Sequence, residues 1–186
     1  MSIEKKDVSK VDFDTKKVYR AWSQKEIKDM KKIAKKLNRN IIIQIIDIQS
    51  KLGLRLDEVV SLKSYRVKNA LKEGKLYIEN RKGGITRSIP LDSESRKTLE
   101  SLDLSRRYCI VPEEYLKKNE IHKFKKSVQN FIYNNQERLL TTLGLRYTFA
   151  QRKYQEFIKS GLSKCESRLK VGSMLGLNPD IISKVL

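Results

Sequence analysis

The chain has 186 residues, enough for one domain with a sizeable core and too few for two comfortable ones. Lys and Arg total 41 against 22 Asp and Glu, and the formal charge of +19 favours a polyanionic partner, nucleic acid ahead of an anionic membrane surface. The sequence has no apolar run near the roughly 20 residues that cross a bilayer, no signal-peptide core and no metal-ligand spacing, so we expect a cytoplasmic protein without a metal.

The first helix is predicted to follow a polar arm. Residues 1–22 are charged and show no clear period, so the folded domain is expected over residues 23–186. Ser23 and Glu26 have the spacing of a capping box. The apolar residues behind them recur along one helical face: Ile27, Met30, Ala34 and Leu37.

The middle of the chain mixes helix and strand signals. Residues 40–53 are rich in isoleucine, yet Asn40 at the start, Gly53 at the end and the length favour a buried helix. A short helix (LDEVVSLK) and a β-hairpin over residues 68–91 follow, with glycines at the turn.

Most of the remaining chain is predicted to be helical. Asp92 or Ser93 caps a helix, an extended YCIVP segment comes next, and a long helix is expected over residues 113–137. Further helices should begin at Arg146, at the capping box of Ser163, and at the Asn-Pro pair at residues 178–179. The fold class is therefore mainly α with a small antiparallel β-sheet (α+β).

Four stretches carry a family resemblance. GLRLDEVVSLK, KGGITRSIPL, LGLRYTFAQRKY and MLGLNPDII resemble, in order and separation, the signature boxes of the tyrosine recombinase (phage integrase) catalytic domain. The resemblance covers roughly residues 23–186 and is closest to integrases of bacterial mobile elements. It implies the recombinase catalytic-domain fold, a DNA substrate and no cofactor, while a separate core-binding domain has no room in this chain.

The resemblance assigns roles to basic residues. Arg55 and Arg146 correspond to the two arginines that clamp the scissile phosphate, work suited to planar guanidinium groups because they donate paired hydrogen bonds. Lys82, in the hairpin turn, corresponds to the lysine that protonates the departing 5′ oxygen. Glu58 matches an acid that supports the first arginine, and Arg87 is predicted to contact DNA phosphates nonspecifically. Each role has a competing interpretation. Arg55 and Arg146 are then ordinary surface arginines, Lys82 contacts the DNA backbone nonspecifically, and Glu58 is a carboxylate that faces solvent from its helix.

Three positions depart from the family pattern. Leu143 replaces the histidine of the second box, Leu177 replaces the histidine or tryptophan of the third, and Leu186 stands where the nucleophilic tyrosine is expected. Aliphatic side chains neither transfer protons nor form a phosphotyrosyl bond, so we expect strand cleavage to be impaired. The alternative is that a tyrosine beyond Leu186, or one from a partner subunit, completes the site. Tyr147 is predicted to pack in its helix.

These observations leave several functions open. The first is an integrase-like recombinase of a mobile element that binds double-stranded DNA, as a homo-oligomer or with a partner recombinase. The second is a noncatalytic DNA-binding regulator or accessory protein on the same fold. The third is a basic RNA-binding protein.

Overall fold

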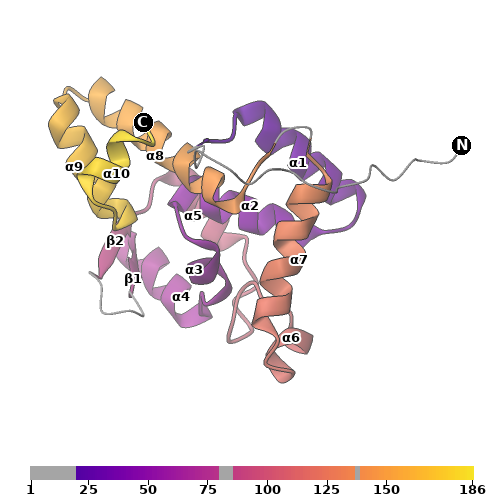
Figure 1. The fold of residues 1–186 in the computed structure, drawn as a ribbon. Coiled ribbons are helices and arrows are strands. Elements are labelled where there is room, and N and C mark those ends of the chain that lie inside the picture. The colour runs from indigo at the N-terminus through magenta and orange to yellow at the C-terminus, as the bar shows by residue number, and fades with distance from the viewer. Residues whose placement is uncertain (1–19, 80–85, 137–138) are drawn as a thin grey trace, which may run out of the picture.

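The computed structural model describes residues 20–79, 86–136 and 139–186. Over these residues the chain is mainly helical, with one two-stranded antiparallel sheet (Figure 1). This confirms the predicted fold class. The first half contains α1 (Gln24–Lys36), α2 (Asn40–Leu52), α3 (Leu56–Val60), α4 (Ser64–Glu73), β1 (Lys75–Ile78) and β2 (Arg87–Pro90). The second half contains α5 (Ser93–Glu100), α6 (Glu113–Lys117), α7 (Ile121–Asn134), α8 (Thr142–Lys159), α9 (Lys164–Leu175) and α10 (Pro179–Ser183).

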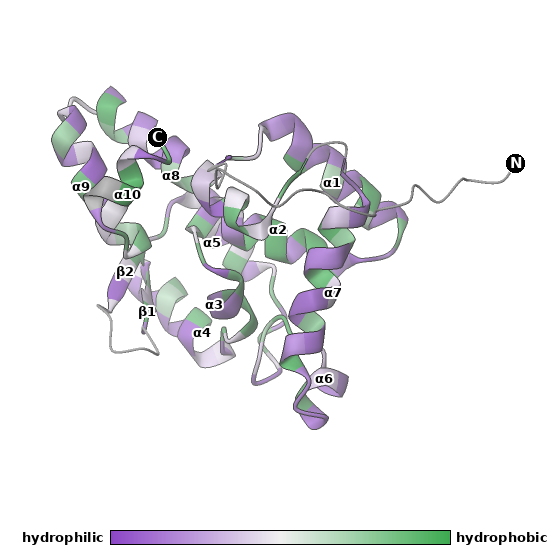
Figure 2. Ribbon diagram, in the orientation of Figure 1, coloured by the Kyte–Doolittle hydropathy of each residue, from purple (hydrophilic) through white to green (hydrophobic). Residues whose placement is uncertain are grey.

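Helix α2 is the central element of the core. It packs against α1, α3, α5 and α8, and its isoleucines at 45, 46 and 48 are fully buried. Apolar residues lie along the inward faces of the surrounding helices (Figure 2). The burial explains why an isoleucine-rich segment forms a helix, since a helix in the centre of a core needs apolar residues on most sides.

Helix ends follow local chemistry. Both predicted capping boxes are present, with Ser23 bonded to Glu26 and Ser163 bonded to Glu166. Helix α8 begins at Thr142 rather than at Arg146, because the Thr141 hydroxyl accepts a hydrogen bond from the Gly144 backbone N–H (3.2 Å).

Two predicted elements are wrong in extent. Residues 68–73 belong to α4 rather than to the hairpin, because Val67 and Ala70 are buried at helical spacing and Gly74 ends the helix in the left-handed region. The strands pair Leu76 with Ile89. The long helix predicted over 113–137 is divided into α6 and α7, with Asn119 between them at φ 53°.

Residues 20–23, directly before α1, are part of the folded core, although the sequence suggested an arm up to residue 22. Trp22 is only 2% exposed, and its indole N–H donates to the Thr141 carbonyl at 2.9 Å. Its backbone N–H donates to the Thr148 hydroxyl (2.8 Å), which in turn donates to the Trp22 carbonyl (2.9 Å). These bonds join the segment to the first turns of α8.

Candidate functional site

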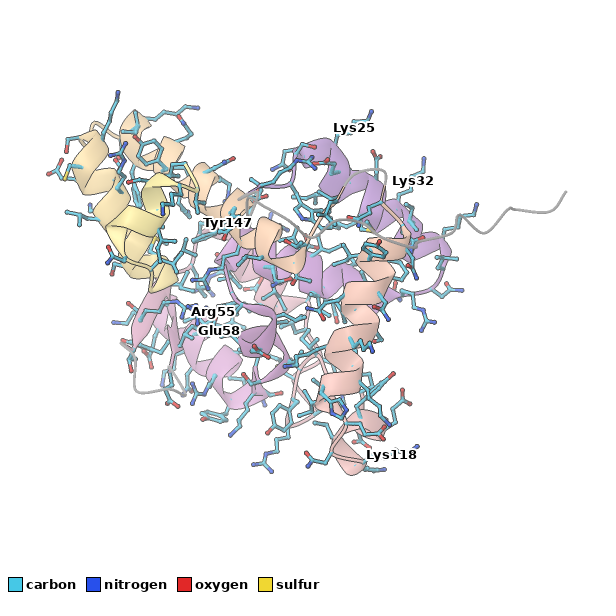
Figure 3. All side chains as sticks on the ribbon, viewed as in Figure 1. Lys25, Lys32, Arg55, Glu58, Lys118 and Tyr147 are labelled. Carbon is cyan, nitrogen blue, oxygen red and sulfur yellow. The ribbon has the colours of Figure 1, made fainter. Side chains whose placement is uncertain are left out.

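Four charged residues from separate parts of the sequence meet beside α3. Arg55 and Glu58 come from the start of α3, Arg87 comes from the inner face of β2, and Arg146 comes from α8. Figure 3 shows Arg55 and Glu58 next to each other, below the start of α8. We call this group the arginine cluster. Three guanidinium groups and one carboxylate give it a formal excess of two positive charges.

Glu58 is held mainly by Arg87. Arg87 Nη1 donates to Glu58 Oε1 at 2.8 Å, and Nη2 donates to Oε2 at 2.6 Å, the paired geometry that makes arginine–carboxylate contacts strong. The Arg55 backbone N–H also donates to Oε2, at 2.7 Å. Desolvation raises the pKa of the Glu58 carboxyl, but the hydrogen bonds and charges of its neighbours outweigh it, so the pKa is lowered and Glu58 is an anion at neutral pH.

Arg146 is buried in the middle of the cluster, with 1% of its surface exposed. Its Nη2 donates to the Leu175 carbonyl, and its Nη1 lies 3.7 Å from Glu58 Oε2. Among the described residues, Nη1 has no hydrogen-bond partner. Burial, together with the charge of Arg87, lowers the pKa of Arg146 to about 9, so it remains a cation at neutral pH.

The C-terminal end of α9 lies against the two buried arginines. The Met174 carbonyl accepts from Arg87 Nε at 2.9 Å, and the next carbonyl, that of Leu175, accepts from Arg146. Helix C-termini leave carbonyls unpaired and carry partial negative charge, so they attract cations. The end of α9 thus occupies donors that a bound anion would otherwise use.

The predicted site residues have different outcomes. Arg55 and Arg146, 91 residues apart in the sequence, belong to one cluster, and the charge of Arg55 is close enough to lower the pKa of Arg146. Arg55 is exposed, and its guanidinium makes no hydrogen bond or ion pair within residues 20–79, 86–136 and 139–186. Lys82 lies outside the described residues.

Arg87 requires a correction. The sequence suggested a nonspecific contact with DNA phosphates, but Arg87 is 6% exposed and its guanidinium is bonded to Glu58 and to Met174. The reason is the alternation of β2, whose positions 87 and 89 face inward. Glu58 was expected to support the Arg55 side chain, whereas it binds the Arg55 backbone and the Arg87 guanidinium.

The apolar replacements lie in different environments. Leu143, in the first turn of α8, is 48% exposed, while Leu177 is half-buried against the core and Leu186 is 36% exposed. Tyr147 is 4% exposed, which confirms that it packs in its helix.

Within the described part of the chain, no three His, Cys, Asp or Glu side chains are grouped as a metal would need. No helix there is long and apolar enough to cross a membrane.

Comparison with known proteins gives matches in structure only. Neither a protein-family model nor a curated protein matches the chain. XerA recombinase is 19% identical with a TM-score of 0.60, over 89% of this chain and 59% of that one. The catalytic domain of bacteriophage HP1 integrase is 17% identical with a TM-score of 0.60, and the match covers 89% of this chain and 86% of that domain.

A third match was solved with DNA. The Tn1549 transposon integrase, in complex with a circular intermediate DNA, is 13% identical with a TM-score of 0.61, over 94% of this chain and 63% of that one. The chain therefore spans less than two thirds of XerA recombinase and of the Tn1549 integrase. These likenesses show that the chain has the fold of a tyrosine recombinase catalytic domain, as the sequence boxes implied.

Proposed function

We propose that this chain is an integrase-like protein of a mobile element that binds double-stranded DNA through the arginine cluster. The observation that carries the proposal is a cluster with excess positive charge, in which exposed Arg55 lies close enough to buried Arg146 to lower its pKa. The Arg146 Nη1 donor has no partner among the described residues. A phosphate oxygen is the kind of acceptor that such donors bind. We also propose a cytoplasmic location, which is where the DNA of a bacterial mobile element lies.

Other cations supply a general attraction. Lys25, Lys32 and Lys118 point away from the body of the molecule (Figure 3) and lie on α1 and next to α6. Such exposed lysines increase nonspecific affinity for any polyanion. The arginine cluster is different because the fold brings its members together from α3, β2 and α8.

Access to the cluster is unequal. Arg55 is exposed and meets a phosphate without rearrangement, whereas Arg146 is covered and donates to Leu175. Direct contact between Arg146 and a phosphate therefore requires the end of α9 to withdraw. Otherwise Arg146 acts on the phosphate only through its charge.

We further propose that strand cleavage is impaired. In this family's reaction two arginines stabilise the transition state and the hairpin lysine protonates the leaving oxygen, roles that fall on Arg55, Arg146 and Lys82. The leucines at 143, 177 and 186 supply neither a proton nor a nucleophile. The same three leucines favour the alternative function, a noncatalytic DNA-binding regulator on this fold.

The phosphate-binding proposal is tested by Arg55→Ala against Arg39→Ala. Both arginines are exposed, and Arg39 lies at the other end of α2, about 20 Å away for a helix of this length. Because each change removes one positive charge, the nonspecific term falls equally in both. Fluorescence anisotropy with a labelled duplex at moderate salt should show roughly a 10- to 140-fold loss for Arg55→Ala, the effect of about 1.5–3 kcal/mol. Equal effects of the two changes would refute the site.

A second experiment tests cleavage. The protein is incubated with a nicked duplex and separated on a denaturing gel, where a phosphotyrosyl intermediate would migrate as a covalent protein–DNA adduct. We expect none. An adduct would show that a tyrosine, from this chain or a second subunit, completes the reaction.

A further inference from the structure

Arg87 controls the charge that Glu58 presents to the other arginines. Both carboxylate oxygens of Glu58 bind Arg87, at 2.8 and 2.6 Å, whereas Arg146 Nη1 stays at 3.7 Å, beyond hydrogen-bond reach. The carboxylate is thus directed to Arg87, although a second guanidinium lies next to it.

The burial of this pair indicates a specific role. The side chains of Arg87 and Glu58 are 4% and 16% exposed. Placing a guanidinium on the inner face of a strand is costly unless it is fully paired, and a buried ion pair is often no more stabilising than apolar residues of similar size. Stability alone therefore does not account for an arginine at position 87.

We infer that Arg87 is a positioning residue for the phosphate site: by engaging both oxygens of Glu58, it keeps the carboxylate from forming a hydrogen bond with Arg146. The Arg146 Nη1 donor is thus left for a DNA phosphate once the end of α9 withdraws. The inference rests on the proposed function. Without Arg87, Glu58 would move to Arg146 and occupy its Nη1 donor, and the cluster would have one positive charge fewer to offer a phosphate.

Arg87 also contacts the C-terminal end of α9. Its Nε holds the Met174 carbonyl, and its Cδ would lie 3.3 Å from a Cβ added at Gly176. From its place on β2, the Arg87 side chain therefore contacts both the Glu58 carboxylate of α3 and the C-terminal end of α9. A variant of Arg87 must accordingly be examined both for folding and for DNA binding.

The test is a double-variant cycle of Arg87→Met, Glu58→Gln and the two combined. Duplex affinity is measured by anisotropy at moderate salt, at a temperature where circular dichroism shows every variant folded. We expect Arg87→Met to weaken binding roughly tenfold or more. Adding Glu58→Gln should restore most of the loss, because no carboxylate then competes for Arg146.

A merely structural role predicts a different result. Arg87→Met would then lower the melting temperature and leave the affinity of the folded protein unchanged, which overturns the inference. A double variant that binds as weakly as Arg87→Met also overturns it. Should Arg87→Met not fold, the cycle uses Arg87→Lys, which keeps the charge but loses the paired geometry, and the same rescue by Glu58→Gln is expected.

Failure of this inference is distinguishable from failure of the proposed function. If Arg55→Ala weakens duplex binding and the Arg87 cycle shows no rescue, only the role of Arg87 is wrong. If Arg55→Ala behaves as Arg39→Ala does, the phosphate site itself is wrong.

Discussion

Gly53 lies at a close approach between three helices, and its replacement by alanine should be strongly destabilising. It ends α2 with φ +64°, a left-handed conformation that costs a non-glycine residue about 1–2 kcal/mol. A Cβ at this position would lie 2.5 Å from Phe149 Cδ1 on α8 and 2.7 Å from Leu175 Cδ2 on α9. Forcing an extra carbon into a packed core adds about 1–3 kcal/mol. We expect Gly53→Ala to lower the free energy of unfolding by roughly 2–5 kcal/mol.

Gly74 provides the matched control. It also has a positive φ, +74°, at the end of a helix, but a Cβ there would meet nothing within 4 Å. Gly74→Ala should therefore cost only the backbone term, about 1–2 kcal/mol. Urea unfolding followed by circular dichroism gives both values, and the difference between them is the packing term. Equal losses for the two variants would refute the reasoning that Gly53 is required by the contact with α8 and α9.

Three further changes test other contacts. Trp22→Ala should cost about 3–5 kcal/mol in urea unfolding, because it empties a buried site beside α8; a loss below 1 kcal/mol would mean that this segment is not part of the core. Ser23→Ala should cost about 1 kcal/mol by removing the cap of α1, checked in the same assay. Desolvation raises the pKa of Asp92, but hydrogen bonds from Lys153 and Ser95 outweigh it and the pKa is lowered from 3.8. The stability contributed by ionised Asp92 is therefore present above pH 3.8 and lost as the pH falls through its lowered pKa. Asp92→Asn should be less stable than the parent at neutral pH, and the two urea midpoints should converge on acidification below about pH 4; a constant difference would exclude the linkage.

The elements that the sequence predicted correctly depend on short-range signals. Capping boxes at Ser23 and Ser163 specify helix starts within four residues of chain, and their bonds are present. The spacing of apolar residues on α1 predicted its buried face, except that Leu37 is 51% exposed because the helix ends at residue 36. Local chemistry was sufficient for these elements.

The errors arise where local signals compete. Residues 64–73 contain both helix and strand formers, and the buried contacts of Val67 and Ala70 decide for a helix. The division between α6 and α7 depends on Asn119 adopting a positive φ, which asparagine tolerates but does not require. Periodicity on both sides of such a residue does not reveal the break.

The cluster was predicted in part. The family boxes predicted that Arg55 and Arg146 act at one site, and the fold brings the charge of Arg55 close enough to lower the pKa of Arg146. Their role at a phosphate stays a prediction. The burial of Arg87 depends on the register of β2 against β1, and the role of the α9 carbonyls depends on backbone atoms that every residue possesses. The type of residue at these positions predicts neither the burial of Arg87 nor the hydrogen bonds to the α9 carbonyls. Only the three-dimensional structure reveals these two features.

The attachment of Trp22 to α8 also gives the protein a native optical probe. Trp22 is the only tryptophan in the chain, and its ring is within 3.0 Å of a Cβ added at Gly144, two residues before Arg146. Indole emission shifts with the polarity around the ring, so a single buried tryptophan reports from one place without an attached dye. A rearrangement of the first turn of α8 on DNA binding should thus be recorded directly, as a change in intrinsic fluorescence that can be followed in a stopped-flow instrument.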